Sequence, residues 1–451
     1  MGVLTDPGAV RAAELPISVG QQALWMLHRL APGSAAYNDA GAARFSPSPN
    51  ISALTEAVQI VTERHDLLRS RFVEDDGMPV RLVDATGPGL RVDDVGTVDD
   101  RQLADLVAAV AGEPYDLARR GTARFRLLRR AAGDAVLVCG NHHIASDAAS
   151  QFVLWRDLLT AYQARSAGRR PDLPALTWTW NDQVAAERRK LAGPQRASWT
   201  SYWRTVGRQV PAGELPSDRP RPARPAYQGG TVTVEVPATL ERAVQDRAMA
   251  LGVTPFAVQL AALQALIHAT GGARDFLIGC PMSLRRSRPT LPAIGYYVNM
   301  VLLRATVDPG GSAADLVQAA ARELRAAAAA AALPYPHIVR ALDRGRDAGP
   351  PYRIAITQVD ARLAFGPDRF DGVVHPFEVP RLQGQYDLGV EIARGQHSSE
   401  IAFRYDRELF AESTIRRYLG AYRRILAAAA HEPGTPVGRL DAVVEPPIVR
   451  I

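Results

Sequence analysis

One short segment constrains the fold of this chain more than any other. The apolar run Ala135–Cys139 is followed by His142 and His143, and an amphipathic helical pattern begins a few residues later. The apolar run predicts a short strand. Successive side chains of a strand point to opposite faces, so one imidazole is expected to enter the packing while the other faces a cavity. We assign His143 to the cavity.

The size of the chain and its apolar content indicate two lobes. A length of 451 residues exceeds what one compact core usually covers, and a hydrophobic content of 47% is ample for two. No window reaches the roughly 18 apolar residues needed to cross a bilayer, and the first residues lack the pattern of a signal peptide. We therefore expect a globular, cytoplasmic protein with no membrane partner. Cys139 and Cys280, the two cysteines, lie in apolar runs and are expected to be buried free thiols.

The charge of the chain argues against nucleic-acid binding. The formal charge of +6 rests on arginine, since Lys190 is the only lysine. The arginines are scattered and do not form one basic run with interleaved aromatic residues, as a nucleic-acid site would require. A mildly basic surface suits an acidic protein partner better.

Helices and strands are expected in both halves of the chain, which predicts an α+β fold, an α/β sandwich. Ser18 is expected to cap a first helix, and Ser150 to cap the helix that follows the two histidines. Strands are predicted at 135–141, 231–236, 275–281, 296–306, 352–359, 387–393 and 400–405, and further helices at 54–64, 254–271, 314–332 and 413–429.

Composition along the chain suggests where the lobes meet. Residues 1–14 are expected to form a disordered leader, and 15–206 the N-terminal lobe that carries the two histidines. The segment 207–230 holds many prolines and glycines and is expected to cross between the lobes. Residues 231–445 would then form the C-terminal lobe.

Seven short motifs occur in a fixed order. His142, His143 and Asp147 match a HHxxxDG signature, with Ala148 in place of the glycine. The six other segments are Ser18–Trp25 (close to SxAQxRLW, with Ala23 where Arg is usual), Arg64–Phe72 (RHExLRTxF), Leu215–Pro222 (LPTDRPRP), Ile294–Asn299 (IGxFVNT), Leu333–Val339 (a poor copy of YPFExLV) and Tyr386–Leu388 (FDL).

These motifs together resemble the condensation domain family of nonribosomal peptide synthesis, within the HHxxxDG acyltransferase superfamily. Each motif alone is weak, but the order of all seven between about residues 16 and 430 is specific. The resemblance implies two chloramphenicol-acetyltransferase-like lobes in a V-shaped pseudodimer, with an inter-lobe tunnel as the active site. Donor and acceptor would enter that tunnel from opposite sides.

The resemblance also implies the partners. Substrates would arrive on the phosphopantetheine arm of an acyl or peptidyl carrier protein, with a small-molecule or carrier-bound nucleophile as acceptor and no bound cofactor. The sequence shows no carrier-protein serine motif, adenylation signature or thioesterase GxSxG. We therefore expect a free-standing condensation enzyme of antibiotic-type biosynthesis, monomeric because two fused lobes can form the site.

The motif residues differ in their expected roles. His143 is the catalytic candidate, because a neutral imidazole can accept or orient a proton at neutral pH; whether it acts as general base or positions the nucleophile stays open. His142 is expected to be structural, hydrogen-bonded under the loop. A buried carboxylate at Asp147 requires a partner, and the resemblance suggests a salt bridge to Arg285, which stands in a segment resembling GxPxxGR.

Three further residues are candidates to line the tunnel: Ser146, Tyr297 and Asn299. For Tyr297 and Asn299 a core tyrosine and a satisfied buried amide are the alternatives. A metal site is not expected, because adjacent residues of a strand diverge and no HxxxH, HExxH or CxxC motif supplies further ligands.

Two departures from the family motifs bear on activity. Ala148 and Leu284 stand where glycine is usual, and a Cβ would strain the backbone if either position needed a positive φ. The resemblance predicts formation of an amide or ester bond between a carrier-tethered thioester and an amine or hydroxyl group. The alternatives are a polyketide-associated O-acyltransferase of the same fold and a non-catalytic carrier-protein recruitment domain. Family members that only bind partners usually lose the second histidine, and His143 is intact.

Overall fold

The computed structural model describes residues 14–222, 228–345, 349–360, 373–379, 384–395 and 398–443. Helices and strands occur in both halves of the chain, which confirms the predicted α+β class. The expected leader lies outside the described residues except for Glu14, as do residues 223–227 of the expected crossing segment.

The described residues form two compact units. The first unit comprises 14–187, 287–296 and 373–379, and the second the remaining residues. This division differs from the predicted limits, because the first unit ends before residue 206 and gains two segments from beyond residue 230. Part of the expected crossing segment packs in the core of the second unit, where Val210 and Leu215 are buried.

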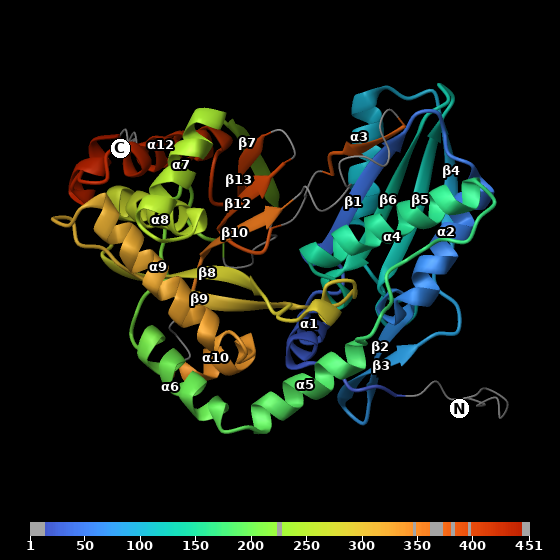
Figure 1. Cartoon of the computed structure of the whole chain (residues 1–451), viewed down its shortest axis with the longest axis horizontal. Coiled ribbons are helices and arrows are strands. Elements are labelled where there is room, and N and C mark those ends of the chain that lie inside the picture. Colours follow the sequence, from blue (N-terminus) through green and yellow to red (C-terminus); the bar gives the residue numbers. More distant parts are fainter. Residues whose placement is uncertain are drawn as a thin grey trace. The chain divides into compact units, whose positions relative to one another are not determined.

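The first unit is built on a five-stranded sheet with the order β11-β1-β6-β5-β4 (Figure 1). Strand β11 comes from late in the sequence and pairs antiparallel with β1, a pairing that the sequence did not predict. The elements of this unit are α1 (Val19–Leu30), β1 (Asn38–Phe45), α2 (Ile51–Arg64), η1 (Asp66–Arg69), β2 (Ser70–Asp75), β3 (Met78–Val83), β4 (Leu90–Gly96), α3 (Asp100–Gly112), β5 (Ala123–Arg130), β6 (Ala135–His142), η2 (His143–Ala145), α4 (Ala148–Ser166), η3 (Arg288–Thr290) and β11 (Val374–Phe377), while α5 (Trp180–Ala192) extends into the second unit.

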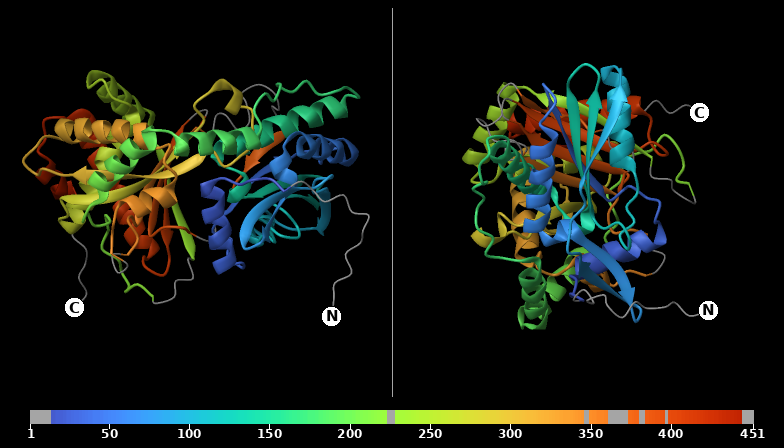
Figure 2. Two further views of the ribbon diagram at one scale, coloured as in Figure 1. Left: turned by 90° about the horizontal axis from the view of Figure 1, so that it is seen from below. Right: turned by 90° about the vertical axis from the view of Figure 1, so that its right-hand side faces the viewer.

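Strand β6 is the centre of this sheet. It lies between β1 and β5, and all eight of its residues are buried. Val136 and Val138 face α3, which covers one side of the sheet, while α2 and α4 pack together on the other. The right-hand view of Figure 2 shows the blue helix α2 and the cyan helix α3 on either side of the strands. A strand covered on both faces explains why its sequence is continuously apolar.

The second unit contains a six-stranded sheet with the order β7-β13-β12-β10-β8-β9, in which β10 is parallel to β8 and β12. Its elements are α6 (Gln195–Gly207), β7 (Gly229–Val236), α7 (Ala238–Ala250), α8 (Pro255–Gly271), β8 (Asp275–Ser283), β9 (Val298–Thr306), α9 (Ala313–Ala330), α10 (Tyr335–Ala341), β10 (Ile354–Asp360), β12 (Leu388–Arg394), β13 (Ser399–Asp406), α12 (Glu412–His431) and η4 (Val437–Val443).

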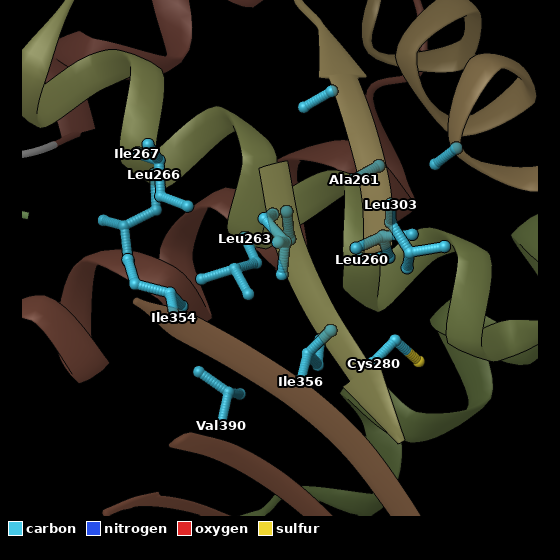
Figure 3. Packing of buried hydrophobic residues seen from close by; sticks show 14 of the residues in the cluster. Leu260, Ala261, Leu263, Leu266, Ile267, Cys280, Leu303, Ile354, Ile356 and Val390 are labelled. Atoms are coloured by element: carbon cyan, nitrogen blue, oxygen red, sulfur yellow. The ribbon is translucent and has the colours of Figure 1, made fainter. Parts of the chain in front are cut away.

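Helix α8 forms the centre of the second core. Thr254 caps its first turn, Pro255 occupies its first position, and Gly272 ends it in the left-handed conformation, an order of residues that is typical of a helix. Each fully buried Leu or Ile side chain here contributes roughly 1.5–3 kcal/mol. Figure 3 shows part of this packing, with Leu260, Ala261, Leu263, Leu266 and Ile267 of α8 against Cys280, Leu303, Ile354, Ile356 and Val390.

Within the described residues, no single helix is both long and apolar enough to cross a membrane. Among these helices, only α7 and α8, a pair bent by 104°, reach that length and composition together.

A buried ion-pair network joins α2 to α4 in the first unit. The carboxylate of Asp157, fully buried on α4, accepts hydrogen bonds from Arg64 Nε at 2.9 Å and from His65 Nε2 at 3.0 Å, and Arg156 pairs with its other oxygen at 2.7 Å. Burial acts to raise the pKa of Asp157, but the hydrogen bond from His65 and the charge of Arg156 outweigh it and leave the pKa below its usual value. The arginine and histidine of the RHExLRTxF-like segment therefore hold α4 in place.

We expect Asp157→Ala to destabilise the protein by about 3–5 kcal/mol, because it leaves buried cationic and imidazole groups without their partner. Urea denaturation followed by circular dichroism measures this loss. The matched control is Asp94→Ala, which removes the exposed ion pair with Arg129 and should change the midpoint little. Equal midpoints for both variants would contradict a structural role for the buried network.

Candidate active site

The two histidines lie at the point where β6 turns into α4. His142 is the last residue of the strand, His143 begins the short helix η2, and α4 starts at Ala148. The N-cap of α4 is Asp147, whose Oδ1 accepts the backbone N–H of Ser150 at 2.7 Å. The prediction that Ser150 caps this helix is therefore wrong by three residues. The carboxylate satisfies an N–H of the first turn and lies at the positive end of the helix dipole.

His142 lies on the α3 side of the sheet and is buried. Its Nδ1 accepts the backbone N–H of Ile144 at 3.1 Å, so the ring proton is on Nε2. The rings of His28 and Tyr115 contact it edge-on, with centroids 5.8 and 6.0 Å away. Burial lowers the pKa of His142 to about 3, with smaller contributions from His28 and His143. His142 is thus a neutral group that holds the turn.

His143 is only partly buried. Its backbone N–H donates to the carbonyl oxygen of Tyr37 at 2.8 Å, which fixes the main chain. The imidazole meets the ring of Tyr296 edge-on, with centroids 5.2 Å apart and an interplanar angle of 88°. Its Nδ1 atom is buried, and no hydrogen-bond partner for it lies among the described residues. Among the described residues, the Nδ1 atom therefore takes no part in holding the side chain in place.

Ser150 connects the loop to a segment that is distant in sequence. Its hydroxyl lies 2.7 Å from Asp147 Oδ1, 2.9 Å from the carbonyl oxygen of Gly295 and 3.0 Å from the Gly295 nitrogen, whose N–H it accepts. All three residues are buried and belong to the first unit. The start of α4 and the segment before Tyr296 are thereby fixed to each other.

Gln21 supports the loop from α1. It completes a capping box with Ser18, and its Nε2 donates to the carbonyl oxygen of Ile144 at 2.8 Å. The indole N–H of Trp180 donates to Gln21 Oε1 at 2.9 Å. This fully buried amide therefore connects the first helix to the residue that follows His143.

Ser146, a candidate for substrate contact, is almost fully buried. Its backbone N–H donates to the carbonyl oxygen of His143 at 3.3 Å. This hydrogen bond closes the turn, so the main chain of Ser146 helps to shape the loop.

Arg285, Tyr297 and Asn299 belong to the second unit. The guanidinium carbon of Arg285 lies 4.2 Å from the centroid of the Tyr297 ring, a cation–π contact. Asn299 Nδ2 donates to the carbonyl oxygens of Ala331 and Leu333 at 2.9 and 2.7 Å, and its Oδ1 accepts the N–H of Tyr335 at 2.9 Å. These contacts favour the satisfied buried amide for Asn299. The pairing of Arg285 with Asp147 stays a prediction.

Neither departure from the glycine pattern strains the backbone. Ala148 is the first residue of α4, its methyl group is exposed, and its φ is not positive. Leu284 also has no positive φ, and its N–H donates to the carbonyl oxygen of Tyr297 at 2.8 Å. The local conformation at both positions is one that any L-residue adopts.

Within the part of the chain that the structure describes, no group of three or more His, Cys, Asp or Glu side chains is arranged to hold a metal ion. The Nδ1 atom of His143 has no hydrogen-bond partner among the described residues. An imidazole can transfer a proton or form a hydrogen bond to another group.

Nearly the whole chain matches one protein family. The family model of the condensation domain covers residues 11–446. The chain belongs to the condensation domain family.

Two synthetases illustrate the relation. The phosphinothricin tripeptide synthetase PhsC of Streptomyces viridochromogenes is 30% identical over 457 residues, covering 97% of this chain and 41% of PhsC. The malpinin synthetase of Mortierella alpina is 29% identical over 442 residues, covering 96% of this chain and 6% of that synthetase. The chain thus spans less than half the length of these curated relatives.

Among solved structures, the X-domain from teicoplanin biosynthesis is similar, with a TM-score of 0.84 and 23% identity over 96% of this chain and 98% of that one. A further structure contains that X-domain in a complex with OxyB. These similarities confirm the fold. Condensation domains work in nonribosomal peptide synthesis on substrates carried by phosphopantetheine arms.

The sequence analysis did not single out Gln21, Ser150 or Tyr296 as site residues. Gln21 had a local signal, since a serine followed three residues later by glutamine indicates a capping box. Its contact to Ile144, 123 residues away, had none. Ser150 was expected only as a cap, and Tyr296 only as part of a strand.

We expect His142→Asn to flatten the pH dependence of stability. The pKa of His142 is about 3 in the native protein, against roughly 6.5 when unfolded. Between these values the unfolded chain binds the additional proton, so the native protein loses stability as the pH falls from about 6.5 towards 3. Asparagine keeps an acceptor for the Ile144 N–H without titrating. Urea denaturation at several pH values between about 6.5 and 4 measures the slope.

The control for this experiment is His375→Asn, which changes an exposed imidazole on β11 of the same unit. It should retain the slope of the wild type. If His142→Asn retained that slope as well, His142 would not be the buried neutral group described above.

We expect Ala148→Gly to leave activity within about twofold and to lower the melting temperature only slightly, because glycine is a weaker helix former than alanine. The comparison variant is Ala161→Gly in the buried middle of the same helix, which should cost clearly more stability. Differential scanning fluorimetry measures both. A marked gain of stability or activity on restoring the glycine would show that Ala148 strains the loop.

Proposed function

We propose that this condensation domain is an acyltransferase that joins a carrier-tethered acyl or aminoacyl thioester to an amine or hydroxyl acceptor. The observation that carries the proposal is the state of His143. Its main chain is fixed by Tyr37, the residue is partly exposed, and its Nδ1 atom has no hydrogen-bond partner among the described residues. A neighbouring imidazole, His142, takes the structural task instead.

The proposed reaction needs only modest help from the protein, because a thioester is already activated. The nitrogen or oxygen of the acceptor attacks the thioester carbonyl carbon, and a tetrahedral oxyanion forms. The carbon–sulfur bond then breaks, and the proton that leaves the acceptor ends on the departing phosphopantetheine thiolate. His143 would accept that proton and pass it to sulfur, or hold the acceptor by a hydrogen bond while the proton moves directly.

The supporting residues act on the geometry of the loop. Gln21 holds the carbonyl oxygen of Ile144, Asp147 holds the start of α4, and Ser150 ties both to Gly295. An imidazole that transfers protons must be held in one position, because a shift of about 1 Å relative to the reacting group can lower the rate about a hundredfold. Ser146 and Tyr297 remain candidates for substrate contact in this proposal.

The second candidate function is recruitment without catalysis. The relevant observation is the structural similarity to an X-domain that forms a complex with OxyB. A chain that only recruits a partner does not need a partly exposed histidine with an unpartnered Nδ1 on a fixed loop, so we favour the enzyme. Acyl transfer to a free alcohol by a polyketide-associated enzyme of the same fold is the third candidate.

Some predictions from the sequence concern the native protein as a whole. Free-standing organisation, a monomeric state and a cytoplasmic location stay predictions. The mass of the native protein, measured in cell extract by immunoblot and intact mass spectrometry, decides the first of them, since this chain accounts for 48.7 kDa.

The test uses an acyl-loaded carrier protein and a panel of free and carrier-bound amines and alcohols, with product detected by mass spectrometry. We expect His143→Ala to lower turnover by about 10² or more, the usual contribution of a positioned proton-transfer group. The control is His375→Ala, an exposed imidazole of the same unit, which should keep full activity.

The outcomes separate the three candidates. Amide products would support the proposed condensation, and ester products from free alcohols alone would favour the O-acyltransferase. Unchanged turnover in His143→Ala would refute the role of the imidazole. An inactive wild type that retains affinity for a carrier protein would favour recruitment.

A further inference from the structure

The imidazole of His143 is fixed differently from two other histidines of the first unit. The ring of His142 is held by the N–H of Ile144, and the ring of His65 by the carboxylate of Asp157. The Nδ1 atom of His143 has no such partner among the residues that the structure describes, and the imidazole meets the ring of Tyr296 edge-on. This ring contact can therefore set the orientation of the imidazole.

Tyr296 is itself firmly placed. A Cβ atom at Gly20 of α1 would lie only 2.6 Å from Cε1 of Tyr296, so the tyrosine ring rests directly on the backbone of the first helix. The preceding residue, Gly295, is bound at both its N–H and its carbonyl oxygen by the hydroxyl of Ser150. The ring thus contacts both α1 and His143.

The phenol stays uncharged over the working pH range. Burial raises the pKa of Tyr296 far above its usual value, and the negative charges of Asp147 and Glu187 and the neighbouring Tyr37 act in the same direction. An edge-on pair of uncharged aromatic rings is a favourable arrangement. Ionisation of the phenol therefore does not disturb the contact over that range.

We infer that Tyr296 is a positioning residue for His143: its ring, wedged against Gly20, holds the imidazole in the orientation needed for catalysis. This inference rests on the function proposed above. The aromatic ring of Tyr296 performs this role and its hydroxyl group does not, because the contact with His143 is made edge-on between the two rings. In this chain a methyl group at position 20 would push the Tyr296 ring out of its place, because its Cβ would lie 2.6 Å from Cε1.

The first test compares Tyr296→Phe with Tyr296→Leu. Phenylalanine keeps the ring and should retain turnover within about twofold, whereas leucine should lower kcat by about tenfold with little change in KM, since aromatic pairs and small misplacements of catalytic groups have effects of this size. Gly20→Ala should act like the leucine variant, although alanine favours the helix. Steady-state kinetics with the acyl-loaded carrier protein measures kcat and KM separately for each variant.

Matched controls exist for both positions. Tyr162 meets Phe45 edge-on in the same unit, with centroids 5.7 Å apart, so Tyr162→Leu removes an equivalent pair away from the loop. Gly33 has no atom within 4 Å of the place where a Cβ would stand, so Gly33→Ala adds a methyl group into open space. Both controls should keep the kcat of the wild type.

A second readout does not need the enzyme to be active. Carbethoxylation of His143 by diethylpyrocarbonate, followed by peptide mass spectrometry, reports how well the ring is covered. We expect His143 to be carbethoxylated at least about threefold faster in Tyr296→Leu and Gly20→Ala than in the wild type and in Tyr296→Phe. The first two variants lose the ring contact that covers the imidazole. Buried His142 on the same peptide serves as an internal reference.

The two readouts separate this inference from the proposed function. If the wild type fails to condense any substrate but the labelling pattern holds, the proposed function fails and the positioning contact stands. If His143→Ala is inactive but Tyr296→Leu matches the wild type in both kcat and labelling, the positioning role is wrong. If Tyr296→Phe lowered kcat as much as Tyr296→Leu does, the hydroxyl group and not the ring would have the role, and the inference would be overturned.

Discussion

The hydrogen bonds around Asp147 are the constraint on which the site depends. A strand that ends inside a protein must return its chain to the surface without leaving polar groups unpaired. Here the carboxylate of Asp147 ends the turn by capping α4, and the Ser150 hydroxyl that it contacts reaches Gly295, 145 residues further along the chain. The place of His143 between β6 and α4 follows from this arrangement.

The alternation of a strand then separates two adjacent imidazoles into two tasks. His142 follows Val136 and Val138 onto the α3 side, where burial keeps it neutral and the N–H of Ile144 binds it. His143 lies one residue later, at the start of η2, and is partly exposed. The same amino acid is thus a fixed, buried acceptor at one position and a partly exposed side chain at the next.

Many elements of the fold could be predicted from local sequence patterns. The contacts that assemble the loop could not, because they join residues far apart in the sequence. The strand before His142, the caps Ser18 and Thr254 and the α+β class depend on residues close together in sequence. Three decisive features depend on distant ones: Gln21 bound to Ile144, Ser150 bound to Gly295, and β11 paired with β1. Spacing rules carry no information about such contacts. For the same reason the limits of the two units differ from those expected from proline content.

The buried polar side chains beside the loop connect secondary-structure elements. Gln151 of α4 donates to the side-chain oxygen of Asn141 at 3.1 Å and to the carbonyl oxygen of Asp39 at 3.2 Å, so one amide joins α4 to β6 and β1. A buried amide without such partners would cost about 1–3 kcal/mol, which apolar side chains in its place would avoid. Hydrogen bonds have directions that apolar contacts lack, so these pairs fix where the start of α4 lies on the sheet, and with it the loop that carries His143.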